Sequence, residues 1–303
     1  MNCPFCNGNA ARAHWYPTTS FAGKTFTYVD CQACRLVYVD PIPTAADLSQ
    51  MYRPDYQAGV NTSLLSSPHV LVGGLRFSYA EQFRLVREQD PRAHILDFGC
   101  GDGHFVANAL AQGFPVTGVE FNRDQVQLLA SAMPDADFLT VDDFFAGSRS
   151  FPVVRLSNVL EHLTDVQATS RALVDKLAPG GMLLIEGPLE ANANVAYFVR
   201  QAYFRLRRAL QPGRLAAHPP FHVFFANRDN QRRFFARVPL DEHHFAVTER
   251  GWPFPERLAD VSSVGGFAKY VIARASMTLS GRVPGWGNTF IYAGRKPAPA
   301  RPS

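Results

Sequence analysis

The chain has 303 residues, of which 47% are hydrophobic and 18% are charged, and its formal net charge is +4. This composition is ordinary for a soluble globular protein, and the length allows one large domain or two smaller ones. The mild charge does not by itself indicate a nucleic-acid partner. No uncharged apolar run reaches about 18 residues, the length that indicates a transmembrane helix, and the N-terminus lacks the pattern of a signal peptide, so we expect a cytoplasmic protein.

Four of the five cysteines form two C-x-x-C pairs near the N-terminus. The pairs are Cys3 with Cys6 and Cys31 with Cys34. Their spacing predicts a structural zinc site, because four sulfur ligands leave no open coordination position. A disulfide pair is disfavoured in a reducing compartment, and a redox motif would not need a second pair. We expect residues 24–31 to form a strand that returns to the metal, Gly8 to provide a left-handed turn, and zinc to stabilise the ribbon 1–40.

The predicted ribbon does not resemble a nucleic-acid interface. Residues 1–40 contain three basic and two acidic side chains, which is a weak electrostatic footprint. The aromatic side chains of this segment are expected to pack the ribbon onto the main domain or to help shape a substrate pocket.

Residues 41–90 are predicted to join the ribbon to the main domain. Thr44 and Asp47 resemble a capping box, which predicts a short helix over 45–52. Residues 57–74 are rich in Gly, Ser and Asn, which indicates a flexible join or a lid. The apolar spacing in 75–89 predicts a helix that leads into the core.

Short apolar strands alternate with helices over residues 91–190. Strands are expected at 94–98, 116–121, 137–141, 153–157 and 182–186, and helices at 103–112, 123–133 and 165–177. This alternation predicts an α/β fold with a Rossmann-like parallel sheet and helices on both of its faces. Ligands of such sheets bind beyond the carboxyl ends of the strands.

The stretch LDFGCGDGHF places three glycines between the first of these strands and its helix. They are Gly99, Gly101 and Gly103. A dinucleotide fingerprint would have its third glycine where His104 stands, so a nicotinamide-dependent oxidoreductase is disfavoured. Glycines let a backbone approach a ligand closely, and Glu120, at the end of the next strand, can accept both hydroxyls of a ribose. These features predict a ribose-containing ligand without identifying it.

The motifs ILDFGCGDGHF, VTGVEFN, VDDF, LSNVLEHL and LAPGGMLLIEGP resemble, in order and spacing, those of class I S-adenosylmethionine-dependent methyltransferases. This resemblance spans residues 92–190. More loosely, the ribbon, the join DPIPTAADLSQMYRPDY and the later FHVFFANRDNQRRFF resemble a bacterial subfamily with an N-terminal zinc-binding segment. That subfamily includes C-methyltransferases that act on nucleotide-linked sugars.

The resemblance implies a role for each strand end. The methionine part of S-adenosylmethionine would contact Asp97, Gly99, Cys100, Gly101 and Gly103. The adenosine part would contact Glu120, Phe121, Asp142 (with Asp143 as the alternative), Phe144, Ser157 and Asn158. Glu120 would bind the ribose hydroxyls and Asp142 the adenine amino group. The alternatives are that Asp142 or Asp143 caps a helix, that Phe121 and Phe144 are core residues, and that the thiol of Cys100 is inert packing.

Methyl transfer requires an aligned acceptor and often a base that removes its proton. Glu161 and His162 follow the fourth strand, which places them near the methyl group, although His162 could equally be a packing or capping residue. His222 matches the histidine of a Glu-His pair in the sugar C-methyltransferases, but Phe221 stands where that family has Glu, so His222 is expected to lack its usual partner. Tyr79 is a further candidate as a proton relay, with helix packing as the alternative.

A catalytic metal is not expected. Some quinone O-methyltransferases resemble this chain at the fourth strand and bind a divalent ion through E-x-x-E-H, but here Asn158 replaces the first acid.

The C-terminal third begins with a basic segment. Residues 191–228 contain six arginines and no acidic residue. The helix expected in VAYFVRQAYFRLRRAL has three interpretations: a cover helix with solvated arginines, a grip on the phosphates of an anionic substrate, or a contact with an anionic membrane. A helix in NRDNQRRFFARV and a last strand in WGNTFIYAGRKP complete the region 191–297, and 298–303 is expected to be a disordered tail.

We therefore expect a methyltransferase that acts on a small anionic metabolite, such as a nucleotide-linked sugar, by C- or O-methylation. The alternatives are a lipid or quinone-type O-methyltransferase at the membrane surface, an RNA methyltransferase, and a zinc-clipped binding module without turnover. The weak charge of the ribbon disfavours RNA. Two departures keep the non-catalytic alternative open: Phe221, where the sugar C-methyltransferases have Glu, and Pro152, where relatives tend to have Asp. Neither the acceptor atom nor the oligomeric state follows from the sequence.

Overall fold

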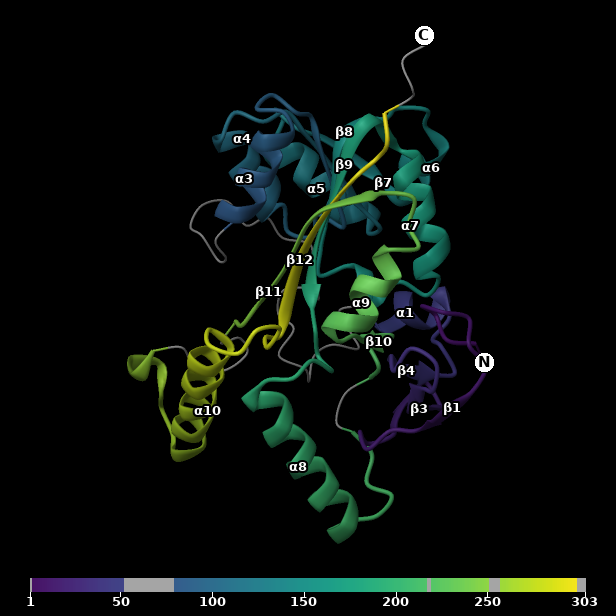
Figure 1. Ribbon diagram of the computed structural model, residues 1–303. Helices are drawn as coiled ribbons and strands as arrows, with labels where there is room; N and C mark the ends of the chain where they lie inside the picture. The colour runs from purple at the N-terminus through teal and green to yellow at the C-terminus, as the bar shows by residue number, and fades with distance from the viewer. Residues whose placement is uncertain (1, 52–78, 217–218, 251–256, 299–303) are drawn as a thin grey trace.

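The computed structural model describes residues 2–51, 79–216, 219–250 and 257–298 (Figure 1). The predicted join 57–74, the start of the predicted helix 75–89 and nearly all of the predicted tail lie outside these residues.

A seven-stranded sheet forms the centre of the molecule. In spatial order its strands are β11 (Asp241–Thr248), β12 (Thr289–Arg295), β9 (Leu177–Pro188), β8 (Phe151–Ser157), β5 (Ile95–Phe98), β6 (Val116–Glu120) and β7 (Asp137–Thr140). The strands from β9 to β7 are parallel, and β12 runs antiparallel to both β9 and β11. The five predicted parallel strands and the last strand are confirmed. β11 was not predicted, because this edge strand begins with the polar run DEHH.

Helices cover both faces of the sheet (Figure 1). They are α3 (Ala80–Gln89), α4 (His104–Ala111), α5 (Arg123–Ala132), α6 (Val141–Ala146) and α7 (Val166–Asp175). The predicted cap of α5 is confirmed, since Asn122 accepts hydrogen bonds from the backbone N–H groups of Asp124 and Gln125. Consecutive strand residues serve opposite faces: Ile95 and Leu96 lie in two different hydrophobic clusters, as the alternation of a strand requires.

The N-terminal ribbon is a second, smaller sheet. It contains β1 (Ala11–Ala13), β2 (Thr19–Phe21), β3 (Lys24–Cys31), β4 (Val37–Asp40) and β10 (Phe224–Phe225). β10 comes from far along the chain and pairs with β4, with Phe224 opposite Tyr38. The ring of Phe5 packs against those of Phe224 and Phe234, at centroid distances of 4.7 and 4.5 Å. The ribbon is therefore joined to the main unit by backbone pairing and by aromatic contacts.

The helix α1 (Ala45–Met51) follows the ribbon as expected. Its predicted capping box is confirmed: the Thr44 N–H donates to Asp47 Oδ2 at 2.9 Å, and the Asp47 N–H donates to Thr44 Oγ1 at 3.1 Å.

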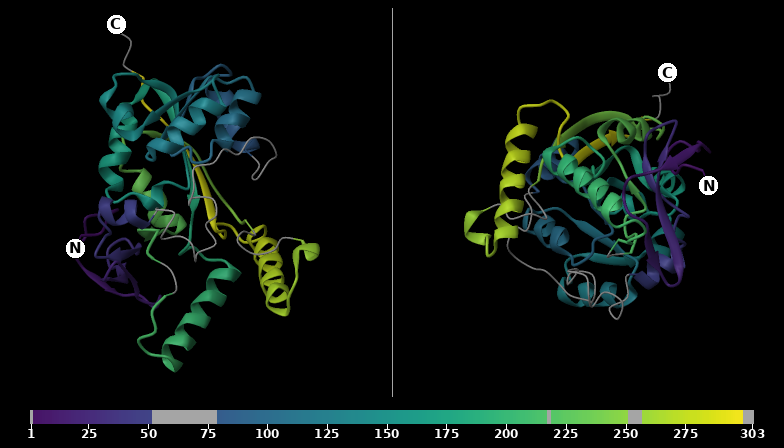
Figure 2. Two further views of the ribbon diagram at one scale, coloured as in Figure 1. Left: turned by 180° about the vertical axis from the view of Figure 1, so that it is seen from behind. Right: turned by 90° about the horizontal axis from the view of Figure 1, so that it is seen from below.

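Three helices follow β9 in the chain: α8 (Val195–Leu210), α9 (Arg228–Phe235) and α10 (Val264–Ser280). Short 3-10 helices lie at Leu160–His162 (η1) and Leu258–Asp260 (η2). Seen from below, α8 crosses in front of the sheet, with α10 on one side and the ribbon on the other (Figure 2). Among the described helices, none combines the length and the hydropathy needed to cross a membrane. The predicted helices α8 and α9 are confirmed, whereas α10 was not predicted.

Candidate active site

The glycine loop after β5 is closed on one side and open on the other. Gly99, Gly101 and Gly103 all have positive φ, at 77°, 55° and 77°. A Cβ atom at Gly99 would lie 2.4 Å from Val159 Cγ2, so a side chain there would collide with the segment after β8. A Cβ atom at Gly101 would meet no heavy atom within 4 Å. The loop thus leaves room for a ligand at Gly101, which is the cradle that the motif predicts.

Glu120 is tied to this loop. Its side chain is buried, with Oε2 accepting a hydrogen bond from the Gly101 N–H at 3.1 Å and Oε1 accepting one from the Phe121 N–H at 2.9 Å. Burial raises the pKa of Glu120, and these backbone donors oppose that rise. Oε1 accepts a second hydrogen bond, from the Asn122 N–H at 3.3 Å. A carboxylate has about four acceptor positions in all, so the group is oriented and retains capacity to bind a hydroxyl. The neighbouring ring of Phe121 is 58% exposed.

Asp97 lies at the end of a buried polar chain. It forms an ion pair with Arg155, whose Nε donates to Gln82 at 2.5 Å. Gln82 Nε2 donates to Glu186 at 2.6 Å, and Glu186 pairs with Arg250. Burial raises the pKa of Asp97 and Arg155 opposes the rise. Among the described residues, Asp97 Oδ2 has no hydrogen-bond partner.

Arg155 had no role in the sequence-based prediction, which treated VVRLS as an ordinary apolar strand. Its guanidinium lies 3.6 Å from the ring centroid of Phe105, and its side chain is almost fully buried. A charged residue in the middle of a buried strand is rarely tolerated without a partner, and this was the available signal.

The candidates for the adenine end differ in exposure. Asp142 is exposed in the first turn of α6. Asp143 takes part in capping that helix, because its carboxylate accepts a hydrogen bond from Thr140 Oγ1 at 2.6 Å. Phe144 is buried and packs against Phe98 at a centroid distance of 5.8 Å. The surroundings of Asp143 therefore agree with the helix-cap alternative, and those of Phe144 agree with the core alternative.

Three further candidates have clear surroundings. Ser157 ends β8, and Asn158 follows it with a φ of 53°, an uncommon conformation for a residue other than glycine and one that recurs at functional sites. Burial raises the pKa of the Cys100 thiol, which agrees with an inert packing role. The Tyr79 hydroxyl contacts His104 Nδ1 at 2.9 Å, so this tyrosine packs beside the glycine loop.

On the other side of the strand ends, His162 holds a neighbouring segment. Its Nδ1 lies 2.9 Å from the Phe221 carbonyl oxygen. A carbonyl only accepts, so Nδ1 carries the proton and Nε2, 3.9 Å from Glu161 Oε1, is the unprotonated nitrogen. Burial, together with the charge of His222, lowers the pKa of His162 to about 3, which keeps this imidazole neutral.

His222 has a carboxylate partner that was not predicted. Its Nδ1 lies 2.7 Å from Oε2 of Glu190, a residue two positions beyond β9. Burial would lower the pKa of His222, but the charge and hydrogen bond of Glu190 outweigh it and raise the pKa to about 9. His222 thus lacks its usual partner, as Phe221 implies, but it is not without a carboxylate, because Glu190 takes that place. The acid comes from the segment LEANAN that follows β9, and its Glu190 was the residue that could have been recognised as a candidate partner.

Glu161 completes this cluster. Burial raises its pKa to about 7, and among the described residues its Oε2 has no hydrogen-bond partner. One ligand atom each of Glu161, His162 and His222 lies within 4.8 Å of the others, a spacing that could hold a metal ion. The expectation that catalysis uses no metal stays a prediction.

The ribbon positions this cluster through the backbone. The Val39 N–H donates to the Val223 carbonyl at 2.9 Å, and the Val223 N–H donates to the Glu161 carbonyl at 2.7 Å. His222 directly precedes Val223, so the imidazole is fixed between a ribbon strand and η1.

The four N-terminal cysteines meet as predicted. Two pairs of sulfur atoms, Cys3 with Cys34 and Cys6 with Cys31, lie 3.5 Å apart, and all four lie within 4.8 Å of one another. The left-handed turns fall at Asn7 and Arg35, with φ of 58° and 65°. The prediction that Gly8 provides this turn was wrong.

Gly8 instead makes room for the sulfurs, since a Cβ atom there would lie 3.2 Å from Cys6 Sγ and 3.5 Å from Cys31 Sγ.

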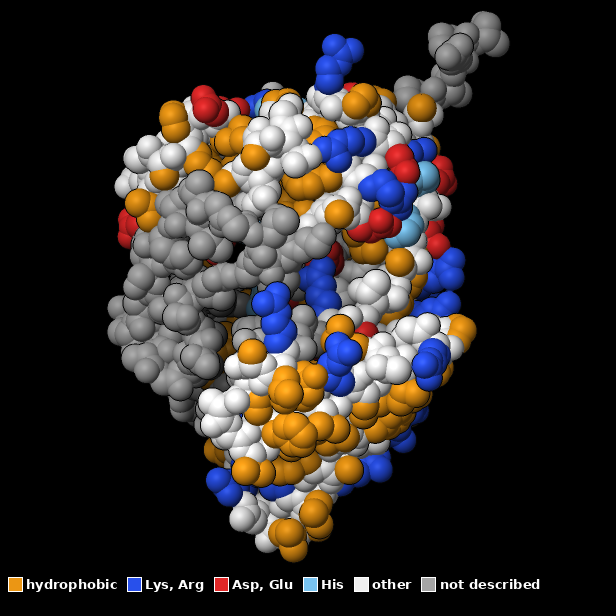
Figure 3. Space-filling view, turned by 90° about the vertical axis from the view of Figure 1, so that its left-hand side faces the viewer, with side chains coloured by type: hydrophobic (Ala, Val, Ile, Leu, Met, Phe, Trp, Pro, Cys, Tyr) orange, Lys and Arg blue, Asp and Glu red, His pale blue; other side chains and the backbone are white. Residues whose placement is uncertain are grey.

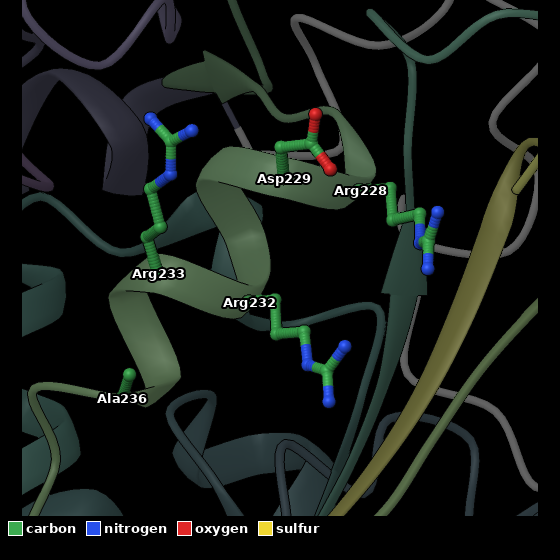
Figure 4. A pocket seen from close by; sticks show the side chains of 5 residues that line it. All are labelled: Arg228, Asp229, Arg232, Arg233 and Ala236. Carbon is green, nitrogen blue, oxygen red and sulfur yellow. The ribbon is translucent and has the colours of Figure 1, made fainter.

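A separate shallow hollow lies on α9, lined by Arg228, Asp229, Arg232, Arg233 and Ala236 (Figure 4). Arg228 and Arg232 extend to one side of the helix and Arg233 to the other. Glu242 binds Arg232 at 2.6 Å and so neutralises part of this charge. This hollow is not built from the glycine loop or from the His222 cluster.

Comparisons with known proteins agree with this geometry. A family model described as a methyltransferase domain matches residues 76–238. The ubiquinone biosynthesis O-methyltransferase of Caulobacter sp. (strain K31) is 26% identical over 158 residues, which cover 49% of this chain and 60% of that protein. The protein of the same name from Xanthomonas campestris pv. campestris (strain B100) is 34% identical over 103 residues, which cover 31% of this chain and 43% of that protein. The chain thus spans about half the length of these curated relatives.

Among solved structures, the [4+2]-cyclase SpnF is similar in fold. Its TM-score is 0.50 at 19% sequence identity, and the match covers 84% of this chain and 97% of that chain. A likeness at this identity shows the fold alone.

Proposed function

Because the chain belongs to the methyltransferase domain family and is an S-adenosylmethionine-dependent methyltransferase, we propose that it methylates a small anionic metabolite whose proton is taken by His222. The observation that carries this proposal is the 2.7 Å contact between His222 and Glu190, beside the buried Glu161. A base beside the carboxyl ends of the strands stands where a class I sheet presents its ligands.

The residues of the glycine loop and its neighbours fit S-adenosylmethionine. When bound, this cofactor supplies a methyl group on a sulfonium that is its own leaving group. The unpartnered Asp97 Oδ2 suits the ammonium of the methionine part, and the open space at Gly101 leaves room for the ligand. Glu120 would bind the ribose hydroxyls, and the exposed ring of Phe121 would pack on adenine beside Asp142.

His222 has the arrangement of an oriented base. Nδ1–H donates to the Glu190 carboxylate, so Nε2 is the nitrogen that can exchange a proton with the acceptor. The carboxylate fixes the tautomer and, by raising the pKa of His222 to about 9, stabilises the imidazolium. The free base that takes the proton is therefore the minor form near neutral pH, and we expect turnover to rise as the pH rises towards about 9. Glu161 is a second proton acceptor, since burial raises its pKa to about 7. His162 stays neutral and holds the Phe221 carbonyl, which positions His222.

Two classes of acceptor are supported by different observations. The resemblance of the ribbon, the join and the FHVFF segment to the sugar C-methyltransferases favours a nucleotide-linked sugar, and the acid-free segment 191–228 would suit its phosphates. The names of the curated relatives favour the second candidate, O-methylation of a quinone-type acceptor.

The four clustered cysteines support a structural zinc ion in the ribbon. The pairing of β10 with β4 suggests that this metal also supports His222. We expect Cys31→Ser to release zinc, measured by elemental analysis, and to lower turnover more than cofactor affinity. Loss of zinc with full turnover would separate the ribbon from the site.

The acceptor is tested by transfer of a labelled methyl group to nucleotide-linked sugars, to a lipid extract and to RNA. We expect label in the sugar fraction, and a much weaker signal from His222→Ala. Label in lipid alone would favour the quinone-type candidate, and label in RNA alone would contradict both.

A further inference from the structure

One helix of the protein is apolar on the side that faces away from the body. In α8, Phe204 packs inward on Trp15 at a centroid distance of 6.2 Å. On the opposite side, Tyr203, Leu206 and Leu210 follow one another at helical spacing, with exposed fractions of 57%, 61% and 72%. No side chain of α8 is buried. The inward aromatic contact explains how α8 is held against the body. It does not explain why the outward side of the helix is apolar.

α10 extends this apolar surface. Val264, Phe267 and Val271 lie on one face of that helix and are exposed. α10 contacts α8, and Trp286, which follows α10, packs on Phe198 of α8 at 5.7 Å. Figure 3 shows hydrophobic side chains gathered over the lower part of this side of the molecule, with Lys and Arg around them and Asp and Glu above. We call the exposed apolar residues of α8 and α10 the two-helix face.

The charged residues within α8 and α10 have one sign, and the acid Glu249 contacts α10 through Ser276 and Ser280. The sequences of α8 and α10 contain no Asp or Glu. Their basic residues are Arg200, Arg205, Arg207, Arg208, Lys269 and Arg274. Arg207 and Arg208 donate to the backbone carbonyls of Leu215 and His14, at 3.2 and 3.3 Å, which orients the guanidinium groups without neutralising them.

We propose that the two-helix face docks onto an anionic phospholipid membrane, with its apolar side chains at the acyl boundary and its basic side chains among the headgroups. Basic residues flanking an exposed apolar stripe are the pattern of a helix that lies in the plane of a membrane. Each basic side chain near an anionic leaflet adds to the attraction. This surface goes beyond the proposed methyl transfer and does not depend on which acceptor is used.

Two other occupants fit these residues less well. A second copy of the chain would bring two positive surfaces together, and neither α8 nor α10 supplies an acidic side chain that would offset their repulsion. Single-stranded nucleic acid is bound through aromatic platforms for its bases, whereas this stripe is dominated by aliphatic residues such as Leu206, Leu210 and Val264. Lipid satisfies both the aliphatic stripe and the charge.

The two-helix face is connected to the proposed active site through the N-terminal end of α8. Asn194 caps α8 by accepting a hydrogen bond from the Tyr197 N–H, and it follows Glu190 closely in the chain. The Glu190 carbonyl accepts a hydrogen bond from Arg200 of α8. α8 therefore connects the membrane-docking stripe with the acid that orients His222, and the stripe begins roughly 14 Å along the helix from its N-terminal cap.

The proposal is tested by sedimentation of the full chain with vesicles. Vesicles of phosphatidylcholine alone are compared with vesicles that also contain phosphatidylglycerol, at rising salt. We expect binding only to the anionic vesicles and a steep loss of binding with salt. The variant Leu206→Ser/Leu210→Ser should weaken binding by about tenfold or more, because both apolar contacts with the acyl region are lost. Adding Arg205→Glu to the leucine variant should weaken vesicle binding further.

Matched controls are Leu128→Ser on α5 and Arg171→Glu on α7, both exposed and away from the two-helix face, and both are expected to bind vesicles like the parent. Calorimetry with S-adenosylmethionine should give one affinity for all variants, which separates this test from the proposed function.

Three outcomes would overturn the proposal. They are absence of binding to anionic vesicles, equal binding by the leucine variant, and a dimer or an RNA complex that the leucine variant abolishes while vesicles remain unbound.

Discussion

The proposed cofactor side and the proposed acceptor side of the site are built in opposite ways. The cofactor side lies at the ends of two neighbouring strands, β5 and β6, and Glu120 is tied to Gly101 by a direct hydrogen bond. The acceptor side gathers Glu161, Glu190 and His222 from three separate segments, and ribbon strand β4 holds one of them through β10. Local bonds therefore maintain the first side, while the second depends on the docking of the ribbon.

This difference predicts that cofactor affinity and turnover can be lost separately. A change on the acceptor side should leave S-adenosylmethionine bound, and a change at Glu120 should remove it. The predictions below test that separation.

His222→Ala has the largest expected effect. It removes the proposed base, so kcat should fall by about 10²–10⁴-fold, and the affinity for S-adenosylmethionine should not change. Labelled methyl transfer and calorimetry measure the two quantities. His243→Ala, an exposed histidine of β11, is the control. Full activity of the His222 variant would remove this residue from the chemistry.

Arg155→Leu probes the polar chain that begins at Asp97. It leaves a buried carboxylate without its counter-ion, which should lower the free energy of unfolding by about 3–5 kcal/mol. Arg149→Leu removes an ion pair with Asp137 in which both side chains are more than half exposed, and should cost at most about 1 kcal/mol. Denaturant titration compares the two variants, and equal losses would show that the buried chain has no special weight.

Glu120→Ala should weaken S-adenosylmethionine binding by about 10²-fold or more while the fold is retained. Each hydrogen bond to a charged group contributes about 1.5–3 kcal/mol, and two ribose hydroxyls lose their acceptor. Calorimetry measures the affinity, circular dichroism checks the fold, and Asp135→Ala, an exposed acid after α5, serves as the control. Unchanged affinity would contradict the ribose role.

The two sides also differ in how far the sequence predicts them. The glycine loop, Glu120 and the Asn122 cap follow from periodicity and spacing within short segments, and the structure places them as expected. The partnership of His222 with Glu190 was missed, because residues separated by a strand end, a helix and a loop meet only after the ribbon docks. Arg155 was missed because its counter-ion lies on the neighbouring strand β5.

The most direct test of the acceptor side needs no acceptor. Nuclear magnetic resonance titration of the histidine rings should give a pKa of about 9 for His222 and about 3 for His162. Glu190→Gln removes the charge that stabilises the imidazolium, so the pKa of His222 should move down while His162 stays neutral. A His222 that titrates at its ordinary value near 6.5 in both proteins would contradict the pairing on which the proposed proton transfer depends.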